Sequence, residues 1–134
     1  MYIGQTAFLE RTFEESDIIN FANLTLDTNP VHLDEGFAKH TRFKKRIAHG
    51  LLTGSLIGAV LGTKLPGSGA VLLKQSFNFK EPVFVGDRVK AVLEVTEINE
   101  KSIGKIVKIK SRCFNQFEII VLDGESTLLI SAIK

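Results

Sequence analysis

The sequence predicts an α+β fold in which an antiparallel sheet of about five strands wraps around one long apolar helix. Hydrophobic residues recur with helical spacing in the first half of the chain and alternate with polar residues in the second half. The chain has 134 residues, the size of one domain, and no linker rich in proline or serine divides it. We therefore expect a single domain over residues 1–134.

Two helices are expected in the first half. Residues 13–25 carry an apolar stripe with a period near 3.6, and Thr12 followed by Glu15 is typical of a capping box. Residues 48–65 are apolar on nearly all sides, which predicts a buried helix. Glycines recur there at every fourth position, namely Gly50, Gly54, Gly58 and Gly62. Each interior glycine costs about 1 kcal/mol relative to alanine, so we expect a backbone or ligand to approach that face closely.

Five segments have the composition and alternation of strands. The expected strands are residues 6–13, 71–80, 88–96, 103–114 and 117–131. A sheet of this kind leaves unpaired edges and an apolar face, so we expect a homodimer or a dimer of dimers.

Composition argues against several classes of protein. The net charge of +2 is too small to indicate a nucleic-acid partner, and few aromatic residues accompany the basic ones. The longest uncharged run, residues 47–63, is shorter than the ~20 residues of a membrane helix. Cys113 is the sole cysteine and no secretion signal opens the chain, so we expect a cytoplasmic protein that binds neither nucleic acid nor membrane.

The stretch DTNPVH at residues 27–32 is the first candidate site. Pro30 disfavours helix at Asn29, which can instead cap a short new turn that contains His32. The purely structural interpretation is a capped turn in which His32 takes no part in chemistry. Asp27 and His32 held in one rigid turn could alternatively orient and deprotonate a water molecule. We expect no metal here, because a third ligand at a familiar spacing is missing.

The start of the second helix is the other candidate site. The first N–H groups of a helix lack intrahelical acceptors, and Gly50 would let a carbonyl oxygen approach without a Cβ in the way. We therefore expect an oxyanion hole at Gly50 and Leu51. His49 either caps and packs at this helix start or orients the oxyanion region.

The basic run RFKKR at residues 42–46 admits two interpretations. It is either a solvated turn or, through Arg42 and Lys45, a binding site for the phosphate groups of a ligand.

Three stretches in order resemble the MaoC-like (R)-specific enoyl-CoA hydratases: LDTNPVHLDEGFA, RIAHGLLTGSLIG and LPGSGAVLLKQSFNFKEPVFVGDRV. The resemblance implies a hot-dog fold, a homodimer and reversible syn hydration of trans-2-enoyl-CoA to (R)-3-hydroxyacyl-CoA. It implies a coenzyme A thioester as substrate and no cofactor.

The resemblance also assigns residues. Asp27 and His32 match the catalytic pair, Asn29 a position that shapes the site, and Gly50 the glycine whose amide polarises the thioester carbonyl. This chain departs from the family at Leu26, where a small residue is usual, and at Gly58, where some relatives carry serine. We expect Leu26 to narrow or reshape the pocket.

Two other functions stay open at this level. Other hot-dog proteins are acyl-CoA thioesterases, and a non-catalytic subunit that binds acyl thioesters is a third possibility. The choice between coenzyme A and acyl carrier protein, the acyl length and the direction of proton transfer between Asp27 and His32 are equally open.

Overall fold

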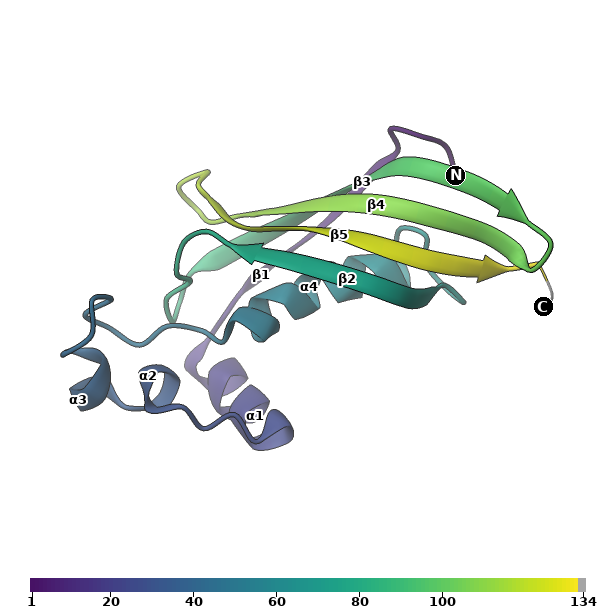
Figure 1. Ribbon diagram of the computed structural model, residues 1–134. Helices are drawn as coiled ribbons and strands as arrows, with labels where there is room; N and C mark the ends of the chain where they lie inside the picture. The colour runs from purple at the N-terminus through teal and green to yellow at the C-terminus, as the bar shows by residue number, and fades with distance from the viewer. Residues whose placement is uncertain (133–134) are drawn as a thin grey trace.

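The computed structural model describes residues 1–132 and confirms the α+β prediction (Figure 1). Five antiparallel strands form one sheet in the order β1-β3-β4-β5-β2. The strands are β1 (Thr6–Thr12), β2 (Val71–Phe79), β3 (Arg88–Lys101), β4 (Gly104–Phe114) and β5 (Ile120–Ser131). The helices are α1 (Glu15–Thr25), α2 (Pro30–Leu33), α3 (Glu35–Ala38) and α4 (Gly50–Thr63).

The core lies between α4 and the curved sheet, which passes over the helix along its length (Figure 1). Alternate residues of β3 and β4 point inward and are fully buried, as the period of two predicts. They meet one face of α4, where Leu56, Ile57 and Val60 are buried. Burying each such side chain contributes roughly 1.5–3 kcal/mol.

The opposite face of α4 is open, so the expectation of burial on all sides is wrong for this chain. Leu51 is 62% exposed, and Gly58 and Gly62 have no heavy atom of the described residues within 4 Å of an added Cβ. The other two glycines do face close neighbours. A Cβ added to Gly50 would lie 2.6 Å from the Phe79 ring, and one added to Gly54 would lie 2.8 Å from the Phe77 ring. A close neighbour is therefore present at two of the four positions, but it is an aromatic side chain of β2 and not the backbone or ligand that we expected.

The start of α1 also differs from the prediction. Phe13 is buried in the core and its N–H donates to the carbonyl of Asp87, so it continues the strand direction and cannot open the helix. The capping box is formed by Glu14 and Asp17, with the Glu14 N–H donating to the Asp17 carboxylate at 2.9 Å. This bond is the largest cause that lowers the pKa of Asp17, with help from Arg11.

Two strands differ from the predicted ranges by more than one residue at an end. β3 continues to Lys101, and β5 begins at Ile120 because residues 115–119 form a turn. In that turn the Asn115 side chain accepts from the N–H groups of Phe117 and Ile119. β2 is an edge strand whose first apolar residues are about half exposed.

The three short helices gather near the N-terminal end of α4, outside the sheet (Figure 1). This places the DTNPVH turn beside the start of α4. Among residues 1–132 no helix is both long and apolar enough to cross a bilayer.

Candidate active site

The carboxylate of Asp27 is placed by the end of α1. The helix ends at Thr25 and its C-cap is Leu26, which adopts a left-handed conformation with φ of 69° and donates its N–H to the carbonyl of Ala22. Asp27 follows, and its Oδ1 accepts from the N–H of Asn29 at 3.3 Å, which closes a local turn. Leu26 itself is 83% exposed and does not line the cavity described below, so the expected narrowing of the pocket is wrong.

His32 lies on the short helix α2, whose start the sequence predicts correctly. Asn29 is the N-cap, Pro30 is the first helical residue, and the Asn29 Oδ1 accepts from the N–H of Val31 at 3.2 Å. The Nδ1 of His32 lies 2.7 Å from the carbonyl oxygen of Ile47. A carbonyl can only accept, so Nδ1 carries the hydrogen and Nε2 of the neutral ring keeps a lone pair.

Burial sets the protonation of His32. Desolvation lowers its pKa, and this outweighs the bond to Ile47, which acts in the opposite direction. The neutral imidazole, able to accept a proton at Nε2, is therefore the form that the site favours.

His49 contacts both Asp27 and His32. It is 2% exposed, its Nε2 lies 2.9 Å from the backbone oxygen of Asp27, and its ring stacks on that of His32 with centroids 3.9 Å apart. Phe21 also packs against the His49 ring, with ring centroids 4.8 Å apart. It makes no side-chain cap bond at α4, so its role is to hold the Asp27 turn against the His32 ring.

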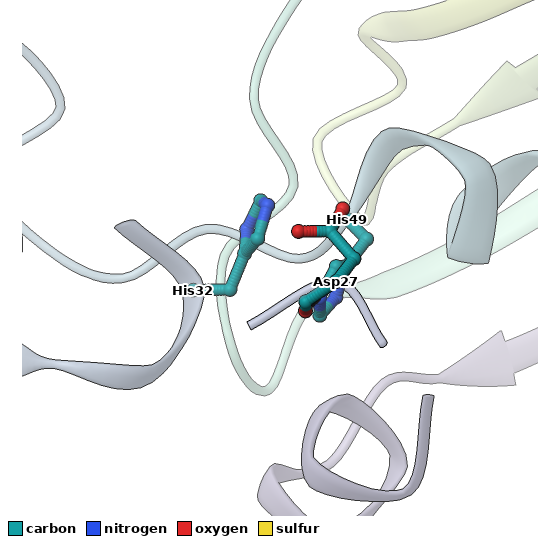
Figure 2. Close-up of side chains that lie close together, drawn as sticks. All are labelled: Asp27, His32 and His49. Carbon is teal, nitrogen blue, oxygen red and sulfur yellow. Dashed lines mark hydrogen bonds between the residues drawn. The ribbon is translucent and has the colours of Figure 1, made fainter. Parts of the chain in front are cut away.

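Asp27, His32 and His49 form one cluster (Figure 2), in which one side-chain oxygen or nitrogen from each lies within 4.8 Å of the others. His49 is a third possible metal ligand in this cluster, which the sequence did not indicate. The Nδ1 of His32 and the Nε2 of His49 each face a backbone carbonyl, so each neutral ring has one nitrogen left that can accept a proton. A carboxylate and two imidazoles so arranged can exchange protons with a bound molecule.

The N-terminus of α4 supplies hydrogen-bond donors. Within residues 1–132 no acceptor is found for the N–H groups of Gly50 and Leu51, as expected for the first turn of a helix. The helix dipole adds a partial positive charge there. The Phe79 ring fills the space where a Cβ of Gly50 would lie, so any larger residue would displace that ring.

A cavity of about 450 Å³ joins these groups. Its wall includes the predicted residues Asp27, His32, Arg42, His49, Gly50 and Leu51. Two predicted binding residues do not line it: Asn29 caps α2, and the Lys45 ammonium lies over the Phe84 ring at 4.5 Å. The sequence reasoning missed several other wall residues, namely Phe43, Thr53, Phe79, Lys80 and Glu81.

Arg46 corrects the expectation that the whole basic run faces solvent or phosphate. Its side chain is 8% exposed, and its Nε donates to the backbone oxygen of His32 at 2.7 Å. Its other nitrogens pair with Glu15 at 2.8 Å and with Glu35 at 3.6 Å. Arg46 thus ties α1, α2 and α3 together behind the candidate site.

Fold and site together define a hot-dog protein with an acid–base cluster at the N-terminus of its central helix. The solved (R)-hydratase from A. caviae involved in PHA biosynthesis superposes with a TM-score of 0.91 at 41% identity, over 97% of each chain. The chain belongs to the MaoC-like family, since the model described as MaoC like domain matches residues 3–113.

Two further relatives are similar along nearly the whole chain. An (R)-specific enoyl-CoA hydratase from Rhodospirillum rubrum is 45% identical, covering 96% of this chain and 88% of that one. A 3-hydroxybutyryl-CoA dehydratase from Methylorubrum extorquens is 44% identical, covering 96% and 80%.

Proposed function

We propose that this protein is a hydro-lyase that reversibly adds water to trans-2-enoyl-CoA and yields (R)-3-hydroxyacyl-CoA. The observation that carries the proposal is the meeting of Asp27, His32 and the free Gly50 N–H in one cavity. The relatives from R. rubrum and M. extorquens, named as a hydratase and a dehydratase of such thioesters, support it.

The first step is polarisation of the substrate. The thioester oxygen accepts from the Gly50 N–H at the positive end of α4. This withdraws electron density from the double bond and makes the β-carbon electrophilic. Negative charge that develops on the oxygen during attack is stabilised by the same donor.

The second step moves one proton. A water molecule between Asp27 and His32 attacks the β-carbon while His32 Nε2 accepts its proton and the Asp27 carboxylate accepts its other hydrogen in a hydrogen bond. The imidazolium then returns that proton to the α-carbon on the same face, so water adds syn and His32 is regenerated. The sum is addition of one water molecule, with no redox cofactor and no metal.

Crotonyl-CoA tests this proposal. The wild-type protein is expected to remove the ultraviolet absorbance of the conjugated double bond without releasing thiol, and chiral analysis is expected to give the (R)-3-hydroxy product. Loss of absorbance with a racemic or (S) product would contradict the assigned stereochemistry, and no loss at all would refute the hydratase.

Hydrolysis of the thioester is the competing activity. It would release free coenzyme A, which a thiol reagent detects. We expect little background from Cys113, which is buried and whose thiol has a pKa raised by burial to about 12. A non-catalytic acyl-thioester-binding protein would instead bind crotonyl-CoA and leave it unchanged.

Two cations in the cavity wall support coenzyme A as the carrier. Arg42 and Lys80 line the cavity, as do the carboxylates of Asp27 and Glu81, and we propose that the two cations hold the phosphates of coenzyme A. Arg42→Ala is expected to raise KM for crotonyl-CoA and to leave KM for crotonyl-pantetheine, which lacks the nucleotide, unchanged. An equal effect on both substrates would contradict phosphate binding, and preference for an acylated carrier protein would favour that carrier.

We also propose a homodimer in a reducing compartment such as the cytoplasm. The half-exposed apolar residues of edge strand β2 and the open face of α4 are surfaces that a second copy could cover. Cys113 is buried and unpaired, which suits a reducing environment.

A further inference from the structure

Thr53 lines the cavity that holds Asp27 and His32, and its hydroxyl is unsatisfied. The residue is 3% exposed, and its Oγ1 is shielded from solvent and has no hydrogen-bond partner among residues 1–132. Buried polar groups are almost always paired in native proteins, so such a group calls for a partner that binds there.

A threonine hydroxyl inside a helix often donates to a backbone carbonyl of the preceding turn, and two other threonines of this protein do so. Thr25 and Thr63 each donate to the carbonyl four residues earlier, at 2.7 Å. The equivalent acceptor for Thr53 is the carbonyl of His49, which already accepts from the N–H groups of Leu52 and Thr53. Both lone pairs of that oxygen are therefore in use, and the Thr53 hydroxyl is left available.

Thr53 lies in the second turn of α4, close to the free N–H groups at the N-terminus of that helix. Thr53 lies three residues after Gly50, so both are on one face of the helix, and side chains lean toward the helix N-terminus. The hydroxyl oxygen is shielded from solvent in the free protein, so rotation about Cα–Cβ to another staggered position is how it would reach an acceptor in the cavity.

We propose that the Thr53 hydroxyl is a second donor to the substrate's thioester oxygen, beside the Gly50 N–H. This inference rests on the proposed hydratase function and adds a catalytic residue to it. The carbonyl oxygen has two lone pairs, so it can accept from the backbone donor and from the hydroxyl together. Both bonds strengthen as negative charge develops on the oxygen during attack of water, and no bond to Thr53 itself forms or breaks.

The kinetic test uses three substitutions. Thr53→Val keeps the shape and removes the hydroxyl, Thr53→Ser keeps the hydroxyl, and Thr63→Val removes a hydroxyl from the same helix outside the cavity. For Thr53→Val we expect kcat with crotonyl-CoA to fall roughly 10²-fold, the size of one lost oxyanion donor. We expect Thr53→Ser to stay within a few-fold of wild type and Thr63→Val to be unchanged.

Stability separates this role from a structural one. The hydroxyl has no partner in the free protein, so Thr53→Val is expected to melt at the same temperature as wild type or higher. An unchanged kcat in Thr53→Val would overturn the proposal. A lower melting temperature with no rescue of kcat by serine would overturn it as well, because the hydroxyl would then serve the fold.

A spectrum tests the donor independently of turnover. Polarisation of the carbonyl of bound sorboyl-CoA, a conjugated dienoyl thioester, shifts its absorption to longer wavelength. We expect this shift in wild type and a smaller one in Thr53→Val, whereas equal shifts would overturn the proposal. If wild type bound and shifted sorboyl-CoA but hydrated no enoyl-CoA, the hydratase function would fail while the Thr53 donor was still supported.

Discussion

His32 and His49 each commit one ring nitrogen to a backbone carbonyl, of Ile47 and Asp27 respectively. This fixes the tautomer of each neutral ring, because a carbonyl oxygen can only accept. His32 is thereby left with a basic Nε2 beside the Asp27 carboxylate, and His49 holds the two in place by stacking. Three side chains from two separate parts of the sequence thus act as one unit.

The pH dependence of hydration is expected to follow the protonation of the His32 ring. Burial lowers its pKa, so the proton-accepting neutral form persists below the ordinary value of about 6.5. Activity should therefore be retained at neutral pH and be lost only as the pH falls through the lowered pKa. A profile of kcat/KM for crotonyl-CoA between about pH 5 and pH 8 measures it, and an acid limb centred above 6.5 would contradict the account.

Leu26 offers a test of backbone strain beside the site. It holds a left-handed conformation with φ of 69°, which costs a residue with a Cβ roughly 1–2 kcal/mol, and glycine relieves it. Leu26→Gly is expected to raise the free energy of unfolding by about 1 kcal/mol in a denaturant titration.

Leu24→Gly is the matched control for that change. Both leucines are 83% exposed, but Leu24 lies in the regular helix α1, so its replacement should lower stability by about 1 kcal/mol. Effects of the same sign at both positions would show that the left-handed conformation is not what matters.

At the scale of elements, the site depends on how the short helices are fixed to the start of α4. α2 and α3 have four residues each and cannot be stable alone. Arg46 supplies the connection, with bonds to the carbonyl of His32 and the carboxylates of Glu15 and Glu35. The turn that carries Asp27 and His32 is therefore held by a buried cation from the segment that leads into α4.

Replacing this cation should affect both stability and catalysis. Arg46→Met keeps much of the volume and removes the bonds, so we expect a loss of about 1.5–3 kcal/mol in the free energy of unfolding and a lower kcat. Arg11→Met removes the exposed ion pair with Asp17 and should cost less than about 1 kcal/mol with no change in kcat. Equal losses in the two variants would contradict the anchoring role of Arg46.

The elements and the turn were predictable because their signals are local. Alternation predicted the strands, and the Asn-Pro pair predicted the cap of α2 that carries His32. The sequence could not separate Arg46, which is buried, from Arg42, which lines the cavity, because only the tertiary fold distinguishes neighbours in one basic run. The same holds for Thr53 and Lys80, whose place in the cavity depends on how α4 packs beside β2 and β5.

At the scale of the whole molecule, apolar side chains of β2 and of α4 stay exposed. Edge strand β2 exposes about half of Val71, Leu72 and Leu73, and α4 turns Leu51 away from the sheet. Sequence periodicity predicted an apolar helix correctly but could not show that one of its sides faces away from its own sheet. A second copy of the chain would account for both surfaces.

Assembly can be measured by light scattering coupled to size exclusion. We expect wild type to have the mass of a dimer and Leu73→Lys to shift it toward the monomer, because a charge on the edge strand opposes pairing. Phe117→Lys is the control, since Phe117 is exposed in the turn between β4 and β5. A monomeric wild type would contradict the proposed dimer.

The central claim is that Asp27 and His32 together perform the addition of water. The most direct measurement is the rate of crotonyl-CoA hydration by wild type, Asp27→Asn and His32→Gln, with the melting temperature of each. The account predicts rates at least about 10²-fold below wild type in both variants, with the fold retained. Rates equal to wild type in either folded variant would contradict it.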